Sequence, residues 1–133
     1  MSVEVTSVLI AQLIAEARSA DPNECCGMLL GEGEGDRVTA IQPAANVHSS
    51  PASHFEIDPQ ALIDAHRAAR AGGPQVLGYY HSHPSGPPEP SATDRRSASG
   101  DGRIWAIIAG EEVRFWRDMP GRFEALSYSI QDG

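Results

Sequence analysis

The 133-residue sequence lacks several features that define common classes of protein. No apolar run approaches the about 20 residues needed to cross a bilayer, and the start lacks the basic segment and apolar core of a signal peptide. Basic residues are scarce, with ten against eighteen acidic ones, and the resulting net charge of −8 disfavours a nucleic-acid partner. We therefore expect a cytoplasmic protein with neither a membrane nor a nucleic acid as partner.

Cysteine is also scarce, and its placement excludes a disulfide scaffold. Cys25 and Cys26 are the only two cysteines and are adjacent, so their Cα atoms lie about 3.8 Å apart, below the usual disulfide range of about 4.4 to 6.8 Å. We expect free thiols that belong to the core, in a reducing compartment. The length predicts a single domain, residues 1–133, which buries roughly two thirds of the surface of the unfolded chain.

The most informative stretch begins where an apolar run, residues 76–80, leads into His81 and His83. Residues two apart in an extended strand point to the same side, so the two imidazoles project together. The turn that follows can return a carboxylate, Asp94, as a third ligand. Catalytic zinc sites hold three protein ligands and keep water in the fourth position. The stretch therefore predicts one hydrolytic zinc ion.

Written as a pattern, the stretch is His-x-His, seven residues, then Ser-x-x-Asp, and Glu24 lies upstream of it. This combination resembles the JAMM metalloproteases, the metal-binding members of the MPN domain group, over residues 3–116. The resemblance implies that Glu24 is the general base and that Ser91 forms a hydrogen bond beside the scissile carbonyl. It also implies three zinc ligands: His81, His83 and Asp94.

The distribution of apolar residues predicts a mixed β-sheet flanked by helices, an α/β or α+β fold. The resemblance implies the MPN version of this fold, which is cytidine-deaminase-like. Helices are expected after a cap at Thr6 or Ser7, at Pro59 after an Asp58 cap, and at Ala92 after a Ser91 cap. A turn is expected at 31–36. Strands are expected at 3–5, 24–30, 37–41, 54–57, 76–80, 103–109, 113–117 and 123–130.

The resemblance further implies a substrate class, namely ubiquitin-like or sulfur-carrier proteins cut after a flexible Gly-Gly tail. The short chain leaves no room for the long insertions with which relatives grip a distal ubiquitin, which favours a peptidase that processes carriers. Two other readings stay open at this point. One is a non-catalytic MPN scaffold, and the other is an iron oxygenase, because two histidines and a carboxylate also form the facial triad.

Three further histidines stand outside the pattern: His48, His54 and His66. His48 lies in a polar stretch, His54 at the start of an expected strand, and His66 on an expected helix. Surface or packing roles are the simplest interpretation of all three, although His54 could lie near a cleft.

Overall fold

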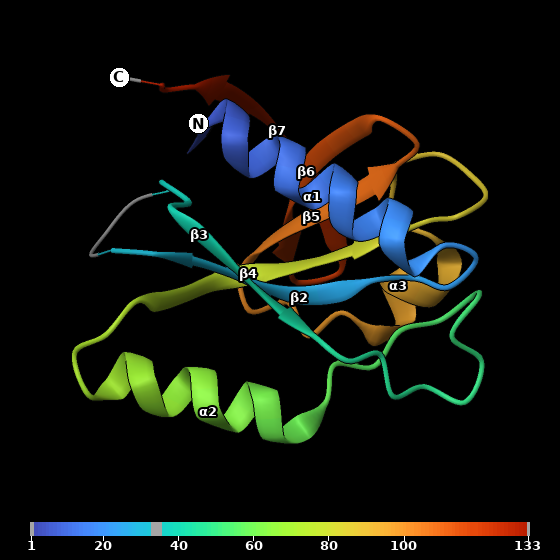
Figure 1. The fold of residues 1–133 in the computed structure, drawn as a ribbon, viewed down its shortest axis with the longest axis horizontal. Coiled ribbons are helices and arrows are strands. Elements are labelled where there is room, and N and C mark those ends of the chain that lie inside the picture. Colours follow the sequence, from blue (N-terminus) through green and yellow to red (C-terminus); the bar gives the residue numbers. More distant parts are fainter. Residues whose placement is uncertain (1, 33–35, 133) are drawn as a thin grey trace.

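The structure, a computed structural model, describes residues 2–32 and 36–132. Its centre is one mixed sheet of seven strands in the order β1-β7-β6-β5-β4-β2-β3 (Figure 1). The strands are β1 Ser2–Val5, β2 Cys26–Gly31, β3 Ala40–Ala44, β4 Gln75–Ser82, β5 Ile104–Ala109, β6 Glu112–Met119 and β7 Arg122–Ile130. The helices are α1 Ser7–Ala20, α2 Pro59–Arg70 and α3 Ala92–Ser97. This confirms the expected mixed sheet flanked by helices.

The sheet is curled, because its two ends approach each other. β1 pairs with β7 in parallel, yet it also meets the segment before β3, where Val38 N donates to Glu4 O at 2.9 Å. β4 and β5 are likewise parallel, and the remaining neighbours are antiparallel. The parallel β4–β5 pair occupies the middle of the sheet and carries the start of the histidine motif.

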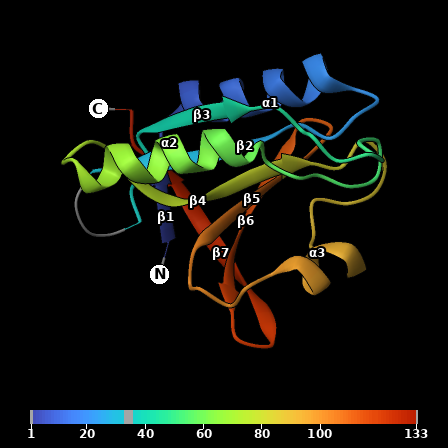
Figure 2. The same cartoon turned by 90° about the horizontal axis from the view of Figure 1, so that it is seen from below.

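Two apolar cores lie on opposite faces of β2. α1 contributes Leu9 and Leu13 to the larger core, and α2 covers the smaller one, which contains Met28 and Ile57. The two helices flank the strands from either side in Figure 1, and α3 lies apart from both in Figure 2. Among the described residues, no helix has the length and apolar character needed to cross a membrane.

Three of the expected strands were placed wrongly. The strand expected at 24–30 begins only at Cys26, because Glu24 N donates to Pro51 O instead of to a neighbouring strand. The strand expected at 37–41 begins later, as β3, Ala40–Ala44, because Val38 pairs with β1 instead.

The third misplaced strand, expected at 54–57, is part of a loop. Its only ladder contact among the described residues is an isolated bridge between Asn46 and Ile57. Of the turn expected at 31–36, residues 33–35 lie outside the described residues.

The two adjacent cysteines are free and buried, as expected. Cys25 packs in the core beneath α1 and Cys26 in the core beneath α2, because consecutive residues of an extended chain face opposite sides. Burial raises the pKa of Cys25 to about 11 and that of Cys26 to about 12. Both groups are therefore protonated thiols at neutral pH.

Native protein at pH 8 should accordingly resist iodoacetamide, because the thiolate is the reactive form and both cysteines are buried. After unfolding in urea, both cysteines should be alkylated. Intact-mass measurement distinguishes zero from two adducts. A native protein that gains an adduct within minutes would contradict this account of the two cores.

Candidate metal centre

The two histidines of the motif are positioned by the middle of the sheet. His81 lies in β4 between Cys26 of β2 and Ile107 of β5, and its side chain is fully buried. His83 follows the end of β4, but its N–H donates to Ile108 O at 2.8 Å and so extends the pairing with β5. The chain stays extended, and both rings project to the same side as the sequence predicts.

Asp94 is oriented by the cap of α3. Ser91 Oγ accepts from Asp94 N at 3.0 Å, and Ser91 N donates to Asp94 Oδ2 at 2.9 Å, which forms a capping box. The helix begins and ends at the predicted residues, Ala92 and Ser97. The cap fixes the carboxylate of Asp94 in the first turn, where it faces the histidines.

Three donor atoms converge at this point. His81 Nε2 and His83 Nε2 are 3.2 Å apart, and each lies 3.1 Å from Asp94 Oδ2. Donors at bond lengths of about 2.0 to 2.1 Å around a tetrahedral ion are separated by about 3.3 Å, close to the observed spacing. The three atoms form the one cluster of possible metal ligands found among the described histidine, cysteine and acidic side chains.

The hydrogen bonds of the rings agree with a cation at the centre of this triangle. His83 Nδ1 lies 2.8 Å from Pro87 O, so this nitrogen carries the proton and Nε2 presents its lone pair to the centre. Lone pairs from two histidines and a carboxylate repel one another unless a positive charge lies between them. This donor set therefore fits a metal ion.

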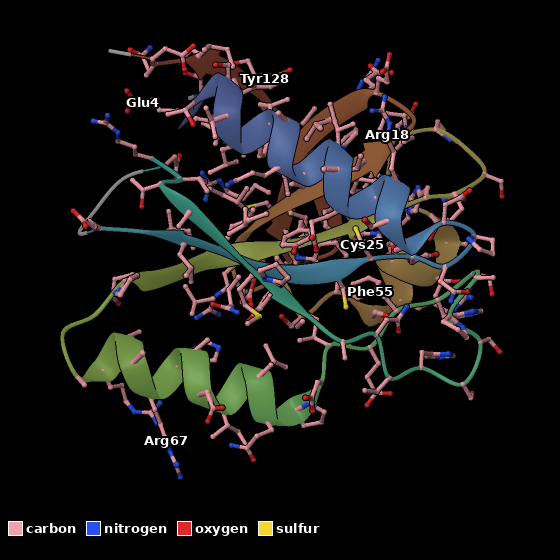
Figure 3. The ribbon with its side chains drawn as sticks, in the orientation of Figure 1. Glu4, Arg18, Cys25, Phe55, Arg67 and Tyr128 are labelled. Atoms are coloured by element: carbon pink, nitrogen blue, oxygen red, sulfur yellow. The ribbon has the colours of Figure 1, made fainter. Side chains whose placement is uncertain are left out.

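His81 is oriented by packing. Phe55 stacks on its ring at a centroid distance of 4.3 Å, and Trp105 meets it edge-on at 5.6 Å. Within the described chain, His81 Nδ1 has no hydrogen-bond partner. Phe55, marked in Figure 3, thus packs directly on a candidate ligand, a contact that the sequence did not predict.

Burial and the neighbouring charges set the protonation of the cluster. Burial lowers the pKa of His81, which favours the neutral imidazole that binds metals. For His83, burial also acts downward, but the neighbouring Asp94 and the hydrogen bond to Pro87 O outweigh it and raise the pKa. Burial acts to raise the pKa of Asp94, yet the two adjacent histidines hold it well below the usual range. Asp94 is therefore an anion.

Glu24 lies in the same cleft. A pocket of about 320 Å³ is lined by Glu24, His83 and Ser91, together with residues of the loop at 52–53 and of the proline-rich loop at 84–90. The Glu24 side chain is buried, and this burial raises its pKa to about 7. A carboxyl group with such a pKa can both take up and release a proton near neutral pH.

Asn46 connects Glu24 to the loop that carries Phe55. Its Nδ2 donates to Glu24 O and to His54 O, both at 3.0 Å. Its Oδ1 accepts from His48 N and Glu56 N, both at 3.1 Å. Sequence reasoning did not identify Asn46, because a half-buried asparagine in a polar stretch resembles any loop residue.

Replacing Asn46 by Ala should lower the free energy of unfolding by about 2 to 3 kcal/mol, because the backbone groups that bond to its amide lose this partner. The matched control is Gln42→Ala, since the exposed Gln42 amide bonds to the adjacent Pro43 O and to no other group among the described residues. Urea denaturation compares the two. A change of less than about 0.5 kcal/mol, as for an ordinary surface substitution, would refute this role for Asn46.

The remaining histidines lie outside the cluster. His48 and His54 stack on each other with centroids 4.7 Å apart, and His66 Nε2 lies 3.5 Å from the hydroxyl of Tyr79. These contacts agree with the packing roles expected for them. Ser53, next to His54, does line the cleft, so that part of the loop reaches the site.

Comparison with known proteins points to one family. The model of prokaryotic homologues of the JAB domain matches residues 6–118. The desampylase of Haloferax volcanii is 35% identical over 83% of this chain and 80% of its own. The probable TtuB-protein conjugate cleaving protease of Thermus thermophilus is 41% identical over 77% of this chain and 63% of its own. The CysO-cysteine peptidase of Mycobacterium tuberculosis is 29% identical over 94% of this chain and 80% of its own.

Solved structures share the fold. The solution structure of protein DSY2949 from Desulfitobacterium hafniense has a TM-score of 0.85 at 30% identity and covers 98% of this chain and 94% of that one. A structure described as JAMM, a metalloprotease-like zinc site in the proteasome and signalosome, has a TM-score of 0.58 at 17% identity. It covers 97% of this chain and 99% of that one. The second likeness is one of fold alone.

Proposed function

Because the chain belongs to the family of prokaryotic homologues of the JAB domain, we propose that it is a zinc-dependent peptidase or isopeptidase. Its substrate would be a ubiquitin-like or sulfur-carrier protein, cut at the amide bond after the C-terminal Gly-Gly tail. The observation that carries this proposal is the convergence of His81, His83 and Asp94 beside the buried carboxyl of Glu24 in one cleft.

The proposed zinc ligands are His81 Nε2, His83 Nε2 and Asp94 Oδ2. Their spacing and the proton on His83 Nδ1 support the assignment. When bound, the ion would supply a positive charge that acidifies water and polarises a carbonyl oxygen. Four protein ligands would close the site, so this set of three favours a catalytic ion over a structural one.

Glu24 acts as the general base. Its carboxylate takes a proton from the attacking water while the water oxygen bonds to the substrate carbonyl carbon. As the C–N bond breaks, the same proton passes to the leaving nitrogen, so the products are a carboxylate and an amine. The pKa of about 7 produced by burial suits both halves of this transfer.

Ser91 stabilises the oxygen that gains charge in this step. Its Oγ already accepts a hydrogen bond from Asp94 N, so the hydroxyl proton is free to be donated to the oxyanion. The residue lines the cleft together with Glu24. Helix capping and oxyanion stabilisation therefore use different parts of one hydroxyl group.

The substrate class is supported by the names of the relatives. One is a desampylase, one is a probable TtuB-protein conjugate cleaving protease, and one is a CysO-cysteine peptidase. The cleft is lined largely by small residues and prolines, drawn from the loops at 52–53 and 84–90. An extended tail without bulky side chains, such as Gly-Gly, suits this shape.

The test is to mix the zinc-loaded protein with the Gly-Gly carriers of its own organism, each extended at the tail by an amino acid or a lysine conjugate. Mass spectrometry should show at least one carrier trimmed back to its Gly-Gly terminus. Unchanged masses for every carrier would refute the proposed function. A protein that instead retains iron would favour the oxygenase interpretation of the same three ligands.

A further inference from the structure

A second pocket, of about 210 Å³, lies between the end of α3 and the β6–β7 hairpin. We name it the arginine pocket, because Arg95 and Arg122 stand on its two sides. Met119, Pro120 and Phe123 provide its apolar lining. Its mixture of arginine, methionine and aromatic side chains is the composition that is enriched in protein–protein interfaces.

The arginine pocket offers unpaired positive charge in a protein that is negative overall. Arg95, Arg122 and the adjacent Arg96 are all exposed, although the chain carries a net charge of −8. Acidic side chains are also close: Asp118 is buried and accepts from Ser99 N and Gly100 N, Glu124 pairs with Arg122 at 3.5 Å, and Asp101 pairs with Arg103 at 3.0 Å. Among the described residues, Arg95 and Arg96 form no ion pair, so their charge is available to a partner.

The arginine pocket is also close to the metal cluster. The ring of Phe123 contacts Trp105 at a centroid distance of 4.9 Å, and Trp105 contacts His81 at 5.6 Å. These two contacts place Phe123 within about 11 Å of a proposed metal ligand. Arg95 directly follows Asp94 in α3, so the pocket and the cluster share this helix as well.

We propose that the arginine pocket docks the folded body of the carrier protein through acidic side chains around its tail. This rests on the proposed function, since the tail must then enter the cleft. An extended chain rises about 3.3 Å per residue, so a four-residue tail spans about 13 Å, more than the separation of at most about 11 Å between the rings of Phe123 and His81. Charge attraction would steer an acidic carrier surface to this face in a chain whose net charge is −8.

The direct test measures binding without cleavage. Glu24→Gln protein is titrated with the organism's own Gly-Gly carriers, each bearing a one-residue extension, by calorimetry. Adding Arg95→Glu and Arg96→Glu should raise the Kd at least about tenfold, and high salt should weaken parental binding similarly. Arg122→Glu, on a different element, should act in the same direction.

The matched control is Arg67→Glu with Arg70→Glu. Both arginines are exposed near the end of α2, and Arg67 points away from the body of the protein in Figure 3. This pair reverses the same number of charges at a distance from the arginine pocket. Its Kd should stay within about twofold of the parent, because exposed charges beyond about one Debye length of the partner are screened.

Equal Kd values for the two pairs of reversals, or no carrier binding to the parent, would overturn the docking proposal. Cleavage separates this failure from that of the proposed function. For this test Glu24 is retained, and kcat/KM is measured for the carrier and for a short peptide of its Gly-Gly tail. Replacing Arg95 and Arg96 by Glu should lower the ratio of the carrier value to the peptide value about tenfold. A wild type that cleaves neither substrate would refute the function itself.

Discussion

Replacing Glu24 by Gln should lower kcat by about 10² to 10⁴, the usual contribution of a positioned general acid–base group. Glutamine keeps the size of the side chain but cannot take the proton from water or deliver it to the leaving amine. The exchange also removes an ionisable group from a buried position, where burial already raises its pKa to about 7. The fold and the metal content should therefore be retained while turnover is lost.

The measurement is kcat for the first carrier found to be trimmed, with circular dichroism and elemental analysis of the same samples. Glu89→Gln provides the control, because Glu89 lines the same cleft but is exposed. It should behave like the wild type. If Glu24→Gln turned over as fast as Glu89→Gln, another group would have to be the base.

Replacing Gly78 by Ala should lower the free energy of unfolding by at least about 3 to 5 kcal/mol, in the range of severe substitutions with a named steric cause. A Cβ atom at this position of β4 would lie 1.7 Å from the carbonyl oxygen of Ile104 in β5. The next two nearest atoms also belong to the Ile104 backbone, so no side chain can move to relieve the clash. The β4–β5 pair would have to separate.

The same strand pair positions His81 and His83, so the variant should also lose metal affinity. Urea denaturation gives the stability, with Gly72→Ala as the control. Gly72 has a positive φ of 94° but open space around it, so only backbone strain of about 1 to 2 kcal/mol is expected there. A Gly78→Ala protein as stable as Gly72→Ala would show that the strands are not this closely spaced.

The parts of the structure that follow from local rules could be predicted from the sequence. The limits of α3 were correct because a capping serine and the acidic residue three positions later define a helix start. The convergence of His81 and His83 follows from the alternation of an extended chain. The buried strands β4 and β5 were visible as short apolar runs between turns.

The parts that depend on distant partners could not be predicted in this way. β3 is displaced because Val38 pairs with β1, far away in sequence. Part of the loop at 46–57 was predicted to be a strand. Instead, the side chain of Asn46 forms hydrogen bonds with backbone groups of this loop and with the backbone carbonyl of Glu24, 22 residues away. Phe55 reaches His81 only through this loop. None of these contacts leaves a periodic pattern in the sequence.

The most direct test of the metal centre is the zinc content of the purified wild type, of His81→Ala and of His66→Ala. The wild type should hold about one zinc per chain and His81→Ala almost none. His66→Ala, which changes a histidine outside the cluster, should match the wild type. Folding of each sample is checked by circular dichroism. A folded wild type that holds no zinc after dialysis against it, or His81→Ala protein that keeps its zinc, would contradict the site described here.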